Sequence, residues 1–355
     1  MLLWLVACGT EAIDEDGGKG AGEEVSPIGT GDGTPASVGW TTILDEEDRL
    51  TDPRDLGFDA AGNLWVANRE DDRTFIVFDP GTDSQDHDRR KDGFAEHFME
   101  ETAALAFDPD AQFGSCGESN NTYNGQAEAN DFMGPVLWST DLDVFAETDP
   151  YGLGSHIDML HESPFCVGIA WEVDNVYWVF DGDHGAIVRY DFQTDHDVGR
   201  DDHSDGIVHR LAEPEVTREP DAPGHMAIHP ETGLLYVADT GNGRVLWIDT
   251  ASGELGGNLR GELEPLEEYK KVEDVEWGVL IEGLDRPGGL ALAGDRLYIG
   301  EFGTGVLHEY DLEGNELRTL DTGLGEAALY GIEIGPDGEM WIAETATPSV
   351  KRIDP

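Results

Sequence analysis

The sequence has little positive charge. Lys and Arg together number 21, whereas Asp and Glu number 76, so the formal net charge is −55. A surface this negative repels phosphate, so we expect no nucleic-acid partner and no direct docking on anionic lipid headgroups. A saline habitat, in which salt screens the self-repulsion, accounts for the charge; calcium spread over many carboxylates is the alternative.

Long apolar runs and cysteines are also scarce. No stretch of 18 apolar residues occurs, so the sequence predicts no membrane-spanning helix. There are only 3 cysteines, whereas glycine is abundant at 46 of 355 residues, which is typical of a chain that turns often. The hydrophobic fraction of 39% is low but sufficient for a core.

The N-terminus reads as a targeting segment followed by a tether. Residues 1–8 form a short apolar stretch ending in Leu5-Val6-Ala7-Cys8, which resembles a bacterial lipobox whose Cys8 thiol takes a diacylglycerol. The alternative is a chance cysteine in a disordered N-terminus. Residues 9–37 are rich in Gly and acidic residues and predict a disordered tether. This resemblance implies an extracytoplasmic, membrane-anchored bacterial lipoprotein, in the periplasm or at the cell surface, that contacts the membrane only through its lipid.

Residues 38–355 repeat one pattern six times. Each copy holds a short alternating apolar segment, a polar turn, a second such segment that ends in an acid or amide, a Gly-rich turn and a third segment. The clearest copy runs from Met226 to Asp249. Alternation of period two predicts strands, and small sheets that cannot bury both faces alone are stable when stacked radially. We therefore predict an all-β, six-bladed β-propeller.

The repeat also predicts how the ring closes. The last copy ends with a third strand at 350–353 and has no fourth, while a spare strand, 38–44, stands before the first copy. We expect this N-terminal strand to complete the C-terminal blade. The second copy is interrupted, and we place an insert at residues 108–135 between its inner strand and the strand at 136–138.

The clearest copy resembles the NHL-repeat family. The likeness is carried by residues 236–245, Tyr-Val-Ala-Asp-Thr-Gly-Asn-Gly-Arg-Val, with weaker matches ending in Asn68, Asp181, Glu301 and Glu344. The resemblance implies the propeller fold and leaves function open, because this fold hosts enzymes, binding modules and scaffolds. We interpret the repeated acids, such as Asp239, as structural acceptors for the following turn or for a neighbouring Arg244.

Aligning the six copies places four polar side chains where inner strands begin, namely Arg54, Asp55, His225 and Tyr330. If they face the channel mouth, they form a ligand-binding constellation. The alternative is that Arg54 and Asp55 pair with neighbours while His225 bonds to backbone.

Two enzyme families similar in fold, the amidating lyases and the regucalcin-like lactonases, imply a channel metal. The lyase pattern needs several histidines at blade starts, and here only His225 is so placed; His161, a few residues ahead of blade three, could be recruited as a second ligand. Neither family's site transfers residue by residue. Eight of the eleven histidines lie between His156 and His229, and the run from Asp195 to Asp205 mixes His with Asp. That run could bind a divalent cation, Ca or Zn, although a solvated rim loop is the simpler interpretation.

The remaining cysteines, Cys116 and Cys166, are candidates for a disulfide. Placed in an insert that follows an inner strand, Cys116 is expected on the opposite face from Cys166, which argues against pairing. The insert itself is rich in Asn, Ser, Thr and Tyr, and either binds a ligand or plugs the channel.

Together these features predict a monomeric binding module for a peptide, glycan or protein partner at one mouth of the channel. The alternatives are a metal-dependent propeller enzyme using His225 and its neighbours, and a purely structural module.

Overall fold

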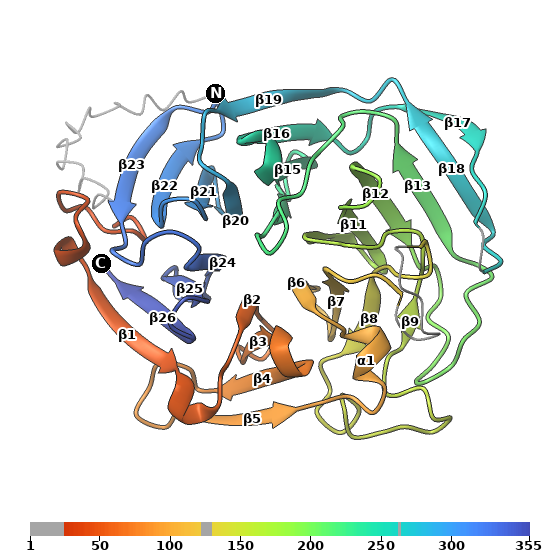
Figure 1. Cartoon of the computed structure of the whole chain (residues 1–355), viewed down its shortest axis with the longest axis horizontal. Coiled ribbons are helices and arrows are strands. Elements are labelled where there is room, and N and C mark those ends of the chain that lie inside the picture. Colours follow the sequence, from red (N-terminus) through yellow and green to blue (C-terminus); the bar gives the residue numbers. More distant parts are fainter. Residues whose placement is uncertain (1–24, 122–129, 262–263) are drawn as a thin grey trace, which may run out of the picture.

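The computed structural model describes residues 25–121, 130–261 and 264–355, and these form a ring of six small sheets around a central axis (Figure 1). The predicted six-bladed β-propeller is confirmed. No helix among the described residues has both the length and the apolar character needed to cross a bilayer. Cys8 and the rest of residues 1–24 lie outside the described residues.

Each blade contains four strands, counted outward from the axis. The inner strands are β2 (Pro53–Phe58), β6 (Thr102–Phe107), β10 (Ile169–Val173), β14 (Met226–Ile228), β20 (Pro287–Ala293) and β24 (Leu329–Ile334). The second strands are β3 (Leu64–Asn68), β7 (Gln112–Gly117), β11 (Val176–Asp181), β15 (Leu234–Asp239), β21 (Arg296–Glu301) and β25 (Met340–Glu344). The third strands are β4 (Arg73–Phe78), β8 (Val136–Ser139), β12 (Ala186–Asp191), β16 (Arg244–Asp249), β22 (Val306–Asp311) and β26 (Ser349–Asp354). The outer strands are β5 (Asp86–Arg90), β9 (Asp158–Met159), β13 (Ile207–Leu211), β19 (Trp277–Glu282), β23 (Glu316–Asp321) and β1 (Gly39–Leu44).

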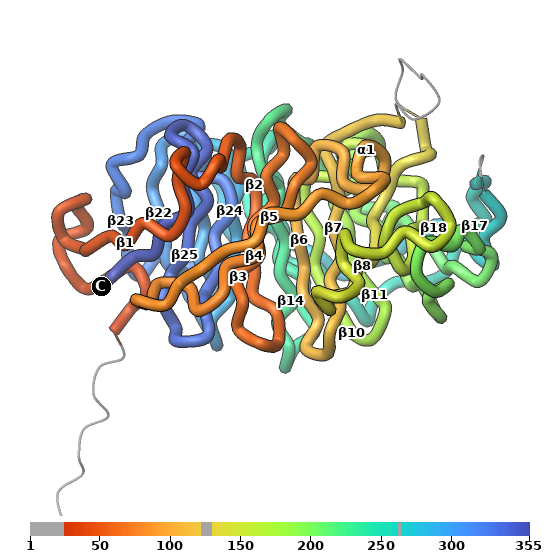
Figure 2. Tube along the Cα trace, turned by 90° about the horizontal axis from the view of Figure 1, so that it is seen from below, coloured from red at the N-terminus to blue at the C-terminus, as the bar shows by residue number. Residues whose placement is uncertain are grey.

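Helical structure is confined to short connections. The only α-helix among the described residues is α1 (Ala95–Phe98), which lies on the upper face in Figure 2. The 3-10 turns are η1 (Pro35–Ser37), η2 (Glu46–Asp48), η3 (Arg69–Asp71) and η4 (Thr240–Asn242). Below, the end of the ring at which the inner strands begin is called the mouth.

The N-terminal strand closes the ring as predicted. β1 pairs antiparallel with β26, with Trp40 opposite Ile353 and Thr42 opposite Lys351. The two strands lie side by side at the left of Figure 1. Because the strand that precedes the first blade is thereby part of the sheet of the last blade, opening the ring requires breaking this pairing.

The described part of the predicted tether is not a free linker, and this corrects its boundary at residue 37. Ile28 is 3% exposed and packs with residues of blades five and six, among them Tyr298 and Ile353. The Ser26 hydroxyl donates to Glu309 Oε2 at 2.6 Å. Ile28 holds this polar segment against the domain, because the two adjoining blades bury its side chain among their apolar residues.

The insert boundary in blade two is also corrected. Residues 112–117 form the second strand β7, so the insertion lies between β7 and β8, not directly after the inner strand. β7 is rich in Gly, Ser and Cys and lacks the β-branched residues of the other copies, which is why the pattern missed it. Gly114 is required there because a Cβ would lie 2.8 Å from Ile169 Cδ1 of the next blade.

One element was not predicted. The hairpin of β17 (Glu254–Asn258) and β18 (Glu268–Glu273) leaves blade four and extends blade three, where β18 pairs in parallel with β13. The hairpin covers the outer edge of blade three at the right of Figure 1. An outer strand that would otherwise expose its hydrogen-bonding edge is thus paired.

In the clearest copy, the repeated acid Asp239 accepts hydrogen bonds from the neighbouring turn, as predicted. Asp239 accepts the backbone N–H of Thr217 at 2.8 Å and the Arg244 Nε–H at 2.7 Å. Its carboxylate is fully buried, so these donors replace water. This interpretation of Asp239 is confirmed.

Candidate functional site at the channel mouth

The four side chains predicted at the blade starts meet in one group, here called the axial cluster. Arg54 and Asp55 begin blade one, His225 precedes β14, and Tyr330 lies on β24. The Arg54 guanidinium carbon is 4.6 Å from the centroid of the Tyr330 ring, and the His225 and Tyr330 ring centroids are 5.9 Å apart. Asp55 Oδ1 lies 3.6 Å from His225 Nδ1. Residues from blades one, four and six therefore converge on the axis.

The aspartate and histidine of the axial cluster are held close to neutral. Burial raises the pKa of Asp55 to about 8, although its carboxylate accepts the Leu105 N–H. Burial also lowers the pKa of His225 to about 4, although its Nε2 donates to the Ala103 carbonyl. Both shifts disfavour the charged forms. At neutral pH the pair is best described as a carboxylic acid beside a neutral imidazole.

A loop at residues 219–224, here called the mouth loop, covers the axial cluster. Ala222 is fully buried and packs against Phe302 and Tyr330. The Asp221 carbonyl accepts a hydrogen bond from Arg54 at 3.2 Å. All four axial residues are at most 9% exposed, because this loop fills the mouth above them. The segment that plugs the channel is thus the connection between blades three and four.

Arginines and carboxylates surround the mouth loop in one network. Arg69 bonds Asp221 and Glu101, each at 2.7 Å. Glu118 is 3% exposed and pairs with Arg218, and it also accepts the Asp221 N–H. Burial raises the pKa of Glu118, while the Asp221 N–H and the two arginines oppose that rise.

Arginine also stacks on aromatic rings around the mouth. Besides the Arg54–Tyr330 pair, Arg218 lies 4.4 Å from the Phe165 centroid and Arg286 lies 5.4 Å from the Phe302 centroid. The chain has only 21 Lys and Arg residues against 76 acidic ones, yet three arginines stack on aromatic rings near the mouth. Because the Tyr330 and Phe302 rings are themselves buried, these stacks orient guanidinium groups at the mouth and expose little ring surface.

A pocket of about 530 Å³ opens beside this network between blades three and four. Its lining is mostly polar and includes His184, Thr217 and Arg218. His184 donates toward Asp181 and lies 3.3 Å from Asp131 of the blade-two insertion. The side-chain hydrogen bond to Asp181 raises the pKa of His184. The pocket is therefore bordered by the mouth network on one side and by the insertion on the other.

The structure joins Cys116 to Cys166 in a disulfide, with the Cα atoms 5.7 Å apart. Cys116 lies near the end of β7, which runs toward the mouth, and Cys166 precedes β10, which starts there. The expectation that the two cysteines emerge on opposite faces was wrong, because it assumed that Cys116 follows an inner strand. The disulfide ties blade two to blade three at the mouth.

His161, the second candidate metal ligand, lies among other partners. Its Nδ1 donates to Glu264 Oε2 at 2.6 Å, near His203, at the rim between blades two and three. None of the contacts described for His161 involves His225. The groups of metal-ligand side chains that the described residues form do not include His225 either.

Sequence reasoning missed the residues that partner the predicted ones. Asp221 and Glu118 were not singled out, and neither were Glu264 and Asp158 of the rim. The one available signal was the crowding of eight histidines between His156 and His229. The sequence separation of 103 between His161 and Glu264 leaves no local pattern.

Comparison with known proteins supports the fold. No protein-family model matches the chain, and no curated protein sequence matches it. Solved structures do match. An auxiliary nutrient binding protein from Bacteroides ovatus is 13% identical with a TM-score of 0.54, covering 90% of this chain and 76% of that one. Virginiamycin B lyase from Staphylococcus aureus is 12% identical with a TM-score of 0.50, covering 90% and 99%. A chain of a nidogen/laminin complex is 14% identical with a TM-score of 0.51, covering 79% and 84%. At these identities the likeness shows the propeller fold.

Proposed function

We propose that this protein is an extracytoplasmic binding module that binds a peptide or glycan chain on its mouth face, in the pocket lined by Thr217 and Arg218. The carrying observation is that this polar pocket is lined by His184, Thr217 and by Arg218, whose guanidinium is held over the Phe165 ring. An open pocket with several hydrogen-bonding side chains suits the many donors and acceptors of peptide and sugar chains. The nutrient-binding protein and the laminin-complex chain among the similar folds are consistent with a binding role.

The axial cluster supports the binding face from beneath. Arg54 holds the mouth loop by donating a hydrogen bond to the Asp221 carbonyl, and Tyr330 packs against Ala222 of the same loop. The loop in turn presents Asp221 to Arg69. In this proposal Arg54, Asp55, His225 and Tyr330 fix the shape of the face, and Arg218 and Thr217 contact the ligand.

The extracytoplasmic setting rests on the disulfide. Bonds such as Cys116–Cys166 form and persist in oxidising compartments and are rare in the cytosol. We propose that Cys8 carries a lipid that anchors the domain. Membrane association of the full chain that is lost on Cys8→Ser tests this proposal; association that persists in the variant contradicts it.

The binding proposal is tested with a pocket-filling variant. The folded domain is screened on peptide and glycan arrays, alongside Thr217→Trp and a matched Thr232→Trp. Thr217 is exposed in the pocket, whereas Thr232 is exposed at the turn between β14 and β15, at the opposite end of the ring.

Binding that Thr217→Trp weakens at least tenfold, and that Thr232→Trp leaves intact, is the expected result. Equal binding by all three proteins would place the ligand elsewhere, and no binding on either array would remove the proposed ligand classes. Both variants alter exposed side chains, so their melting temperatures should match that of the parent.

A further inference from the structure

Histidines and carboxylates gather at the rim between blades two and three, outside the pocket proposed to bind the ligand. This group, here called the rim cluster, comprises His97, His156, His161, His196, His203, Asp158 and Glu264. Their side chains come from α1, from β9 and the chain around it, from the β12–β13 loop and from the β17–β18 hairpin. The sequence interpretation of the Asp195–Asp205 run as a solvated loop does not fit its histidines, since the His196 side chain is 3% exposed and that of His203 is 11% exposed.

The hydrogen bonds of two of these histidines fix where their lone pairs point. His196 Nδ1 lies 2.8 Å from the Asp197 carbonyl, and His203 Nδ1 lies 2.6 Å from Glu264 Oε2. Both partners can only accept, so each Nδ1 carries the proton in the neutral ring. In that neutral form each Nε2 atom holds a lone pair. Both are buried, and neither has a hydrogen-bond partner within the described residues.

Asp158 provides a third donor at the same point. Its side chain is 1% exposed, and its Oδ1 lies 3.8 Å from His196 Nε2. One ligand atom each from Asp158, His196 and His203 lie within 4.8 Å of one another. A bound cation would satisfy the buried carboxylate and the two imidazole nitrogens together.

We propose that Asp158 and the Nε2 atoms of His196 and His203 bind a divalent transition metal, with zinc as the preferred ion. Two imidazoles and one carboxylate are a donor set that zinc favours, and a fourth position remains for water or another ligand. Zinc ligands at about 2.0–2.2 Å in a tetrahedron stand roughly 3.3–3.5 Å apart, so the 3.8 Å separation closes with small side-chain shifts.

Glu264 is a positioning residue in this site. It accepts from the Nδ1 of His203 and also from the Nδ1 of His161. A carboxylate on the far nitrogen of a ligating histidine orients the ring and raises its basicity. The second possible triad, His161, His203 and Glu264, is less suited to a metal, because both of these hydrogen bonds would have to break.

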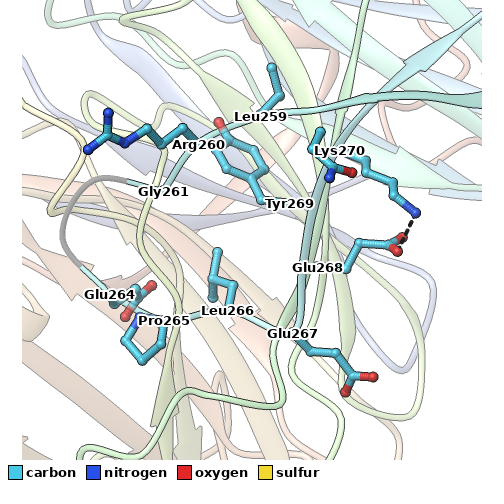
Figure 3. Close-up of a pocket in the computed structure, with 11 residues that line it drawn as sticks. Leu259, Arg260, Gly261, Glu264, Pro265, Leu266, Glu267, Glu268, Tyr269 and Lys270 are labelled. Carbon is cyan, nitrogen blue, oxygen red and sulfur yellow. Dashed lines mark hydrogen bonds and ion pairs between the residues drawn. The ribbon is translucent and has the colours of Figure 1, made fainter.

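The surroundings favour entry of a cation. A hollow of about 480 Å³ is lined by His196 together with Asp195, Asp197, Asp202 and Asp205. On the hairpin side, Glu264 lines a second pocket of about 550 Å³ together with Leu266 and Tyr269 (Figure 3). Carboxylates in this density attract divalent cations to the site entrance.

The test uses the tag-free domain, stripped with a chelator and titrated with Zn²⁺ against a competing indicator. One equivalent should bind. His203→Gln and Asp158→Asn should each lower the affinity at least 100-fold, and Glu264→Gln about 10- to 100-fold. His209→Gln is the matched control, because His209 pairs with Glu268 outside the cluster. Co²⁺ loading adds a readout independent of affinity, since a tetrahedral site gives intense visible absorption that His203→Gln should abolish.

Three outcomes would overturn the site: no stoichiometric zinc in the parent, equal zinc affinity in His203→Gln and the parent, or loss of zinc in His225→Gln while His203→Gln retains it. Far-ultraviolet circular dichroism shows whether each variant is folded. If Asp158→Asn fails to fold, the His196→Gln variant takes its place. Failure here leaves the peptide- or glycan-binding proposal untouched, because Thr217 and Arg218 do not belong to the rim cluster.

Discussion

The Arg54 guanidinium carbon lies 4.6 Å from the centre of the Tyr330 ring, and this contact joins the innermost strand of the first blade to that of the last. At the outer edge the chain itself links the two blades, because β1, which leads into the first blade, pairs with β26 of the last blade. The first and last blades are therefore linked both near the axis and at the outer edge. Arg54, which makes the axial contact, also holds the mouth loop by donating to the Asp221 carbonyl.

The closure of the ring by β1 can be weakened by truncating one side chain of that strand. Ile43 on β1 is 3% exposed and packs with Leu56 and Trp341 between the first and last blades. Ile43→Ala should lower the free energy of unfolding by about 2–4 kcal/mol through the lost burial and the cavity left behind. Chemical denaturation followed by tryptophan fluorescence measures this. The neighbouring Thr42 is exposed, so Thr42→Ala should change stability by less than about 1 kcal/mol. Equal effects of the two variants would show that β1 does not bear on closure.

The disulfide should add stability through the unfolded chain. Cys116 and Cys166 are separated by 50 residues. By loop-closure entropy, a crosslink of this span stabilises the folded domain by roughly 4 kcal/mol. The Cys116→Ser/Cys166→Ser double variant should therefore unfold at lower denaturant concentration, and the parent should shift equally in dithiothreitol. A parent whose intact mass shows two free thiols would contradict the bond.

Asp55 should make stability fall as pH rises. Burial raises its folded-state pKa to about 8, whereas the unfolded value is near 3.8. The folded protein thus retains a proton that the unfolded chain releases, so this contribution is complete below pH 4 and is lost toward pH 8. The slope is about 1.4 kcal/mol for each pH unit. Asp55→Asn keeps a neutral acceptor for Leu105 N–H and should remove that slope; an unchanged profile between pH 5 and 8 would refute the assignment.

His225 should have the opposite effect on the acid side. Burial lowers its folded-state pKa to about 4, below the unfolded value near 6.5. Below pH 6.5 the unfolded chain binds a proton that the folded protein refuses, so stability falls by about 3 kcal/mol between pH 6.5 and 4. The difference in unfolding free energy between the parent and His225→Gln, measured across this range, isolates the histidine. A constant difference would mean that His225 titrates normally in the fold.

Sequence periodicity predicted the features that repeat. The six blades, the closing strand before residue 44 and the convergence of Arg54, Asp55, His225 and Tyr330 all follow from aligning copies of one unit. A radial repeat places equivalent positions around one axis, so the alignment carries three-dimensional information.

The features that occur once could not be predicted in this way. The mouth loop, the β17–β18 hairpin and the site of Glu264 depend on connections that depart from the repeat. β7 escaped detection for a related reason, because its small residues pack against Ile169 and Tyr177 of the next blade. Tertiary packing, not local pattern, decides such segments.

Salt should stabilise the domain, because self-repulsion among 76 acidic side chains acts against the compact state. Screening grows steeply as the Debye length shrinks from about 30 Å at 0.01 M to about 3 Å at 1 M salt. At pH 7.5 the melting temperature should therefore rise by several degrees between 10 mM and 1 M NaCl. Near pH 4, where carboxylates take up protons and the net charge falls, the same salt step should have much less effect. If the increase is equal at both pH values, salting-out of apolar surface explains it, and charge repulsion does not limit the stability of this protein.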